Sequence, residues 1–173
     1  MIVETSHPIV DAVLDQHRDA VGTQLPAYRN HVLRSLNYQS LLLGEPVSDA
    51  AALAWAIHDL GVWTAETWDY LEPSADLADV HAAEFGITDI DAVRRMVLDH
   101  HRLRRNDNRV VETFRIADRI DATRGRLYRP LTRADIDTVV GQLPYLGFHT
   151  YLARRALTYA VAHPLRPLPM VRW

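Results

Sequence analysis

The sequence predicts an all-α protein that folds as a single domain of about eight helices. Apolar residues recur at helical spacing along most of the 173 residues, and alternating β-branched runs and Asn-Gly hairpin turns are absent. No repeat or low-complexity linker divides the chain. We expect one domain over residues 1–173, with a core at about 25–125 and a C-terminal part at 133–173 packed on it.

The first two helices are expected at residues 9–21 and 27–43. The first segment, IVDAVLDQHRDAV, places its valines and isoleucine largely on one stripe, as a helix packed against a core does. The second, AYRNHVLRSLNYQSLLL, is closed by Gly44 and followed by Pro46. Glycine just after a helix, with proline a little further on, is typical of a helix C-terminus.

The third helix is expected over residues 51–64, AALAWAIHDLGVWT, with Ser48 or Asp49 as its N-cap. Its first half is apolar on every side, which predicts a buried helix. A fourth helix is expected at residues 74–85, with its first serine as the cap and Gly86 at its C-terminus.

The remaining helices are expected at residues 90–104, 109–124, 133–142 and 145–163. The first of these begins after the N-cap Asp89, a turn RNDN follows it, and the next ends at Gly125. The end of the chain, HPLRPLPMVRW, holds three prolines and is not expected to be helical. We expect Met170 and Trp173 in this tail to pack back onto the body.

Composition excludes several classes of function. The apolar fraction is 48%, yet no run of eighteen apolar residues predicts a membrane span, and no basic N-terminal region predicts a secretory signal. Cysteine is absent, which excludes thiolate ligands and fits a cytoplasmic protein. The net charge of −3 disfavours nucleic-acid binding. All basic residues are arginines, which excludes lysine-based covalent catalysis and a P-loop.

The buried third helix ends on His58 and Asp59, which raises the question of what neutralises the carboxylate. An unpaired buried carboxylate is costly, so Asp59 requires either a metal ion or an arginine as its partner. On other helices the spacing to apolar neighbours also places a histidine or aspartate on the inward face. These inward residues are His31, His81, His100 and Asp118, and His101 lies on the flank of its helix. Imidazole and carboxylate ligands without sulfur suit a divalent ion such as Mn, Fe, Co, Ni, Zn or Mg, one or two per chain.

Each of these residues also has a simpler interpretation. A lone inward histidine often bonds a backbone carbonyl, and for His81 both interpretations stay open. Histidines assigned to such structural roles or to the surface are His7, His17, His149 and His163. Aromatic residues near the doublet either line a pocket or fill the core; they are Tyr28, Trp55, Trp63, Trp68 and Tyr70.

The order H…HD…D, formed by His31, the doublet His58-Asp59 and Asp118 within IADRID, resembles the HD superfamily of metal-dependent phosphohydrolases. The resemblance spans about residues 25–125. It implies a helical core that holds the metal, with Asp59 able to bridge two ions. The flanking sequence is also similar to a group of small bacterial HD-domain proteins over nearly the whole chain.

The longer order H…HD…H…H…D is similar to HD-domain enzymes with two metals, which include cyclic-dinucleotide phosphodiesterases and mixed-valent diiron oxygenases. In that case His81 and His100 (or His101) are implied as second-metal ligands. The GYP segment of the phosphodiesterases is missing, and Val62 stands where they have lysine and where nucleotidases have glutamate. Cleavage of cyclic dinucleotides and 5′-nucleotidase activity are therefore not expected.

The resemblance implies a metal-dependent phosphohydrolase that attacks a phosphorylated small molecule or nucleotide with a metal-activated water. Asp59 and His100 are the expected catalytic residues, and Arg29 and Arg102 the expected contacts to an anionic substrate. Arg102 is otherwise part of a solvated helix end. The alternatives are a diiron oxygenase and a non-catalytic, metal-stabilised binding module. No nucleic-acid or membrane partner is expected, and a homodimer stays open.

Overall fold

The computed structural model describes residues 2–171 and shows one all-α domain with no strand among these residues. In chain order the elements are α1 (Pro8–Gln16), α2 (Arg18–Val21), η1 (Gly22–Gln24), α3 (Leu25–Leu43), α4 (Asp49–Ile57), α5 (Gly61–Thr64), α6 (Leu71–Ala82), α7 (Ile90–Asp99), α8 (Arg109–Ala122), α9 (Arg133–Gln142) and α10 (Phe148–Ala162). Within this described part, eight helices have nine residues or more. The predicted fold class is therefore confirmed.

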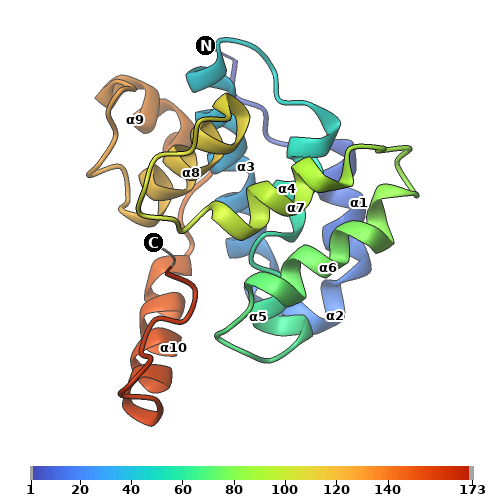
Figure 1. Ribbon diagram of the computed structural model, residues 1–173. Helices are drawn as coiled ribbons and strands as arrows, with labels where there is room; N and C mark the ends of the chain where they lie inside the picture. Colours follow the sequence, from blue (N-terminus) through green and yellow to red (C-terminus); the bar gives the residue numbers. More distant parts are fainter. Residues whose placement is uncertain (1, 172–173) are drawn as a thin grey trace.

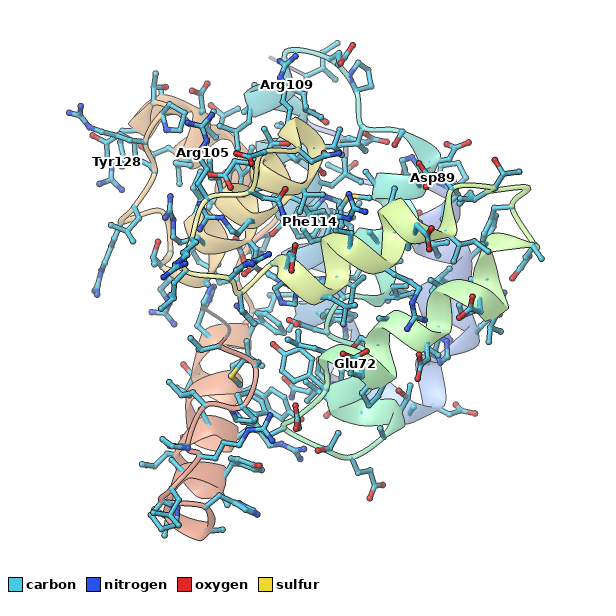
Figure 2. The ribbon with its side chains drawn as sticks, in the orientation of Figure 1. Glu72, Asp89, Arg105, Arg109, Phe114 and Tyr128 are labelled. Carbon is cyan, nitrogen blue, oxygen red and sulfur yellow. The ribbon has the colours of Figure 1, made fainter. Side chains whose placement is uncertain are left out.

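The central helix of the bundle is α4, whose residues 51–57 are all buried. It contacts α1, α3, α6 and α7, while α3 lies along α8 (Figure 1). Trp55 of α4 stacks on Phe114 of α8, with 3.6 Å between ring centroids. Figure 2 shows Phe114 inside the bundle, whereas Arg105 and Arg109 lie at its edge. The predicted burial of this helix is confirmed.

Two helix starts follow the sequence signals closely. The Ser48 side chain accepts a hydrogen bond from the Ala51 amide, and the Asp89 side chain accepts one from the Ala92 amide. Both are N-caps that satisfy amides left free at the first turn. The α3 helix ends at Gly44, which has a φ of +77° that glycine adopts without strain.

The predicted first and third helices are each interrupted. The first breaks at His17, whose backbone is not helical (φ −100°, ψ 12°) and whose ring contacts His81. The third stops at Ile57, and the turn at residues 58–60 precedes the short α5. In this turn the Leu60 N–H donates to the Ile57 carbonyl at 3.0 Å. Consecutive side chains on a regular α-helix point about 100° apart. The turn instead lets the side chains of His58 and Asp59 face one interior point.

Three other predicted boundaries are wrong by several residues. The α6 helix begins at Leu71, so Ser74 is not its cap; its hydroxyl instead accepts a hydrogen bond from the Gly61 amide at 2.9 Å. The α7 helix ends at Asp99 rather than near residue 104. The last helix begins at Phe148, after Gly147 with a φ of +84°.

The C-terminal tail is not helical and runs back alongside α10 (Figure 1). Met170 is buried against Val62, Trp68, Tyr70 and Leu71, as expected of the tail. Trp173 lies outside the described residues. No helix in residues 2–171 is long and apolar enough to cross a membrane. The division of the domain at about residue 125 stays a prediction.

Candidate metal centre

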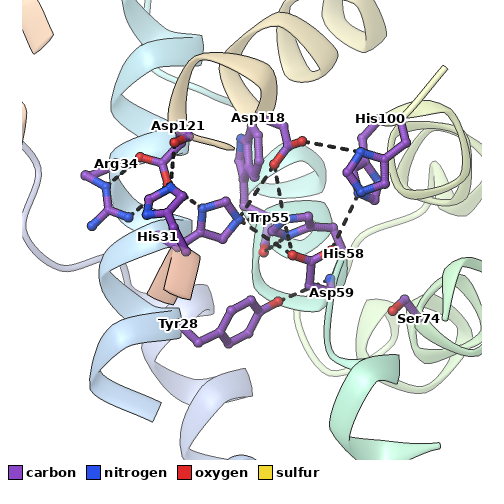
Figure 3. Close-up of polar contacts among 12 residues, drawn as sticks. Tyr28, His31, Arg34, Trp55, His58, Asp59, Ser74, His100, Asp118 and Asp121 are labelled. Carbon is purple, nitrogen blue, oxygen red and sulfur yellow. Dashed lines mark hydrogen bonds and ion pairs between the residues drawn. The ribbon is translucent and has the colours of Figure 1, made fainter. Parts of the chain in front are cut away.

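Six buried or partly buried side chains meet at the centre of the bundle, and together we call them the His/Asp cluster (Figure 3). They are His31 of α3, His58 and Asp59 of the turn after α4, His100 and His101 directly after α7, and Asp118 of α8. Four separate segments thus converge on one point. His31 and Asp118 are 87 positions apart in the sequence, so only the packing of the helices brings these residues together.

The distances within the cluster are short. The Nε2 atoms of His31 and His58 lie 3.0 Å apart. The Oδ2 atom of Asp59 lies 3.7 Å from His31 Nε2 and 3.4 Å from His58 Nε2. The Oδ1 atom of Asp118 lies 3.7 Å and 3.8 Å from the same two nitrogens. Two imidazoles and two carboxylates therefore surround one small space.

The second half of the cluster lies on the other side of the two carboxylates. The Oδ1 atom of Asp59 lies 3.5 Å from His100 Nε2, and the Oδ2 atom of Asp118 lies 3.7 Å from His101 Nδ1. Each carboxylate thus turns one oxygen toward the pair His31 and His58 and the other toward a histidine after α7. The cluster contains three overlapping groups of potential ligand atoms, each within 4.8 Å. Each of the three groups is a candidate site for a metal ion.

Two atoms in the cluster lack hydrogen-bond partners although they are buried: Asp59 Oδ1 and His100 Nε2. A buried polar atom without a partner costs about 1–3 kcal/mol, and more where the group is charged. A cation between these atoms would remove that cost. The donor set of nitrogen and oxygen atoms fits the divalent ions expected from the sequence.

The histidine rings are held so that a nitrogen faces the cluster. His58 Nδ1–H donates to the Trp55 carbonyl at 2.8 Å, and His100 Nδ1–H donates to the Val97 carbonyl at 2.6 Å. Each Nε2 is thereby left with a lone pair. His101 is held by its other nitrogen, since Nε2 lies 2.7 Å from the Tyr70 hydroxyl. Such outer hydrogen bonds fix the ring orientation that metal ligands require.

The sequence interpretation missed Asp121 and Arg34, which hold His31. Asp121 Oδ2 accepts a hydrogen bond from His31 Nδ1–H at 2.7 Å, and Arg34 donates to both oxygens of Asp121. Neither Arg34 nor Asp121 is exposed. Their spacing was a usable signal, because Arg34 follows His31 by three residues and Asp121 follows Asp118 by three, each pair on one helix face.

Burial and neighbouring charges shift the pKa values of the cluster residues in different directions. Burial lowers the pKa of His58 to about 3, so its ring is neutral. Burial opposes ionisation of Asp59, but the neighbouring His58 and His100 bring its pKa below its ordinary value. Burial raises the pKa of Asp118 to about 6, and the two carboxylates raise the pKa of His100 against the effect of its burial. The raised pKa values of Asp118 and His100 favour binding of protons where a cation would otherwise lie.

Three residues expected at the site lie elsewhere. His81 is buried as its helix face predicts, but its Nε2 lies 3.0 Å from His17 Nε2 and its Nδ1 lies 3.5 Å from Glu84, so it belongs to no group of the cluster. The second-metal role of His81 therefore stays a prediction, which its distance from the cluster does not support, whereas His100 and His101 are members of the cluster.

The two arginines expected to hold the substrate also lie away from the cluster. Arg29 pairs with Asp11 at 2.8 Å and donates to the Thr5 carbonyl. Arg102 is partly exposed and lies 3.5 Å from Asp99. Each guanidinium has a carboxylate partner near the surface, so the substrate-binding roles of Arg29 and Arg102 stay predictions that the position of these residues does not support.

No protein-family model, curated protein or solved structure matches the chain. The class of protein is therefore defined by fold and site alone. It is an all-α domain whose buried His/Asp cluster is suited to a metal ion.

Proposed function

We propose that this protein is a metal-dependent hydrolase that cleaves a phosphate ester of a small molecule. The observation that supports this proposal best is the His/Asp cluster, in which buried histidines are oriented by outer hydrogen bonds toward two shared carboxylates. The sequence order of His31, the doublet and Asp118, which resembles the HD superfamily, supports the same proposal.

In this proposal the residues of the cluster have different positions around the metal centre. His31 and His58 hold one side of the centre, His100 and His101 hold the other, and Asp59 and Asp118 lie between them. A divalent ion held by these residues would supply Lewis-acid polarisation of a phosphoryl oxygen and would lower the pKa of a bound water toward neutrality. Asp59 and Asp118 each lie near both halves, so metal binding is expected to depend most on these two carboxylates.

The test is a panel of phosphomonoesters and phosphodiesters, offered to protein reconstituted in turn with Mn, Fe, Co, Ni, Zn and Mg. We expect phosphate or alcohol release that requires the metal and is lost in Asp118→Asn. The matched control is Asp107→Asn, because Asp107 is exposed in the turn before α8 and should leave the rate unchanged. Equal hydrolysis by Asp118→Asn and wild type would contradict the proposal.

A mixed-valent diiron oxygenase is the second candidate, and one observation favours it. The cluster offers four histidines and two carboxylates, enough to hold two irons, with His100 and His101 beyond the four residues of the H…HD…D order. Two irons per chain and oxygen consumption without phosphate release would select this candidate. One equivalent of another divalent ion with phosphate release would select the hydrolase.

A non-catalytic binding module stays a third prediction, which turnover of any substrate would exclude. The expected cytoplasmic location, the absence of a nucleic-acid partner and a homodimer also stay predictions.

A further inference from the structure

A cavity of about 300 Å³ adjoins the His/Asp cluster. One of its walls is formed by cluster residues, namely His31, Asp59, His101 and Asp118. A molecule in this cavity therefore reaches the proposed metal centre directly. The volume lies at the lower end of the range of ligand pockets, about 300–1,000 Å³, which indicates a small ligand.

Another part of the lining is apolar and comes from the loop before α6, from α10 and from the C-terminal tail. It is formed by Trp68, Phe148, Leu152, Ala156 and Met170. Trp68 and Met170 are 7% and 5% exposed, so they are fixed parts of the core. Phe148 stacks on His31, with ring centroids 4.5 Å apart, and joins this wall to the cluster.

The cavity contains no arginine among the described residues that line it. Arg29 and Arg102, the substrate contacts expected from the sequence, are paired with carboxylates elsewhere. His149, which also lines the cavity, has its pKa lowered by burial. Arg154 and Arg155 line a neighbouring hollow, which shares Trp68 with the cavity, and neither of them lines the cavity itself. A second or third phosphate of a nucleotide would thus find no counter-charge in the cavity.

We propose that this cavity binds the uncharged, apolar part of the substrate, so that the substrate is a small aryl or branched alkyl phosphomonoester rather than a nucleotide. This inference rests on the proposed hydrolase function. In the reaction the water oxygen forms a bond to phosphorus and the ester P–O bond breaks. The proton from water goes to the leaving oxygen, and the products are the alcohol and inorganic phosphate.

The decisive variant is Ala156→Phe, which adds a large side chain to the cavity wall at a position on α10 outside the His/Asp cluster. Its matched control is Val161→Phe on the same helix, where the side chain is 76% exposed. We expect the ratio of kcat/KM for phenyl phosphate to that for methyl phosphate to fall at least about tenfold in Ala156→Phe. The ratio should stay unchanged in Val161→Phe, and metal content should stay unchanged in both.

A binding measurement keeps this test separate from the proposed hydrolysis. Fluorine NMR of 4-fluorophenol, an uncharged probe without phosphate, should show saturable binding to wild type and to Val161→Phe but not to Ala156→Phe. Absence of binding to wild type, or equal binding to Ala156→Phe, would overturn the cavity assignment. Binding as expected without any turnover would instead count against the hydrolase and leave the cavity assignment supported.

Two further results complete the design. Leu152→Ala shortens a side chain of the same wall and so enlarges the cavity. This variant should bind the larger probe 6-fluoro-2-naphthol with higher affinity than wild type does. The result tests the cavity even if Ala156→Phe fails to fold. A nucleoside monophosphate hydrolysed in preference to phenyl phosphate would contradict the proposed substrate class.

Discussion

The carboxylate of Asp121 has no oxygen free to bind a metal, because Arg34 and His31 already engage both. The Arg34 guanidinium holds the pKa of Asp121 well below its usual range despite burial. The two side chains therefore form an ionised pair. Its contribution at the residue scale is therefore to hold the His31 ring with Nε2 toward the cluster. Arg34 also donates to the carbonyls of Leu143 and Pro144, so the same pair ties α3 to the segment after α9.

We predict that Asp121→Asn weakens metal binding by about 10–100-fold, since His31 loses the charged group that orients it. The free energy of unfolding should fall by about 3–5 kcal/mol, because Arg34 is left buried without its partner charge. Competition titration with a metal chelator and urea unfolding would measure the two effects. Asp15→Asn, which removes the exposed partner of Arg18, is the control and should change neither. An Asn variant with wild-type metal affinity would show that Asp121 does not position His31.

Residue order and helix faces predicted His31, His58, Asp59, His100 and Asp118 as inward residues, and all are buried together. His81 is also buried as predicted but contacts His17 instead of the cluster, because a helix face predicts burial and not which neighbour fills the interior beside it. Arg34 and Asp121 were missed because charged residues within a helical pattern are usually exposed. Only the packing of α3 against α8 reveals that the two charges neutralise each other.

At the scale of elements, the turn between α4 and α5 positions both residues of the doublet. It depends on the close approach of α6, where a Cβ added at Gly61 would lie 2.6 Å from the Tyr70 carbonyl oxygen and 2.9 Å from Ser74 Oγ. The sequence predicted a single helix here because its apolar residues continue without a break. The turn follows instead from tertiary contacts, which periodicity does not record.

We predict that Gly61→Ala lowers the free energy of unfolding by about 1–3 kcal/mol and weakens metal binding, because α6 must move away from the doublet. Gly141→Ala in α9 is the matched control, since nothing lies within 4 Å of its added Cβ. That variant should be as stable as wild type or up to about 1 kcal/mol more stable. Thermal unfolding of the metal-free and metal-loaded forms would measure both. Equal stability of Gly61→Ala and wild type would mean that α5 and α6 are not packed this closely.

At the scale of the whole molecule, metal binding should depend on pH, because cluster residues that are protonated in the metal-free protein must lose their protons before the metal binds. Asp118, with a pKa raised to about 6, and His100, with a raised pKa, must both release protons to bind an ion. His58 is already neutral at this pH, because its pKa is about 3. Affinity should therefore be nearly constant well above pH 7 and fall as the pH drops through 6. The fall should be about tenfold per pH unit for each proton displaced.

Calorimetric titration of the metal in buffers of different ionisation enthalpy would count these protons. Proton release between pH 6 and 7 should shrink in Asp118→Asn. Metal affinity that stays constant down to pH 5 would contradict the placement of Asp118 at the ion.

The measurement that tests the central claim most directly is the metal content per chain of protein purified without chelator or added metal, for wild type, Asp59→Ala and His81→Ala. We predict one or two divalent ions per chain in wild type, the same content in His81→Ala, and loss of the metal from Asp59→Ala even where circular dichroism shows that it is folded. Full metal occupancy in folded Asp59→Ala, or a wild type that binds no divalent ion even after reconstitution, would contradict a metal centre at the His/Asp cluster.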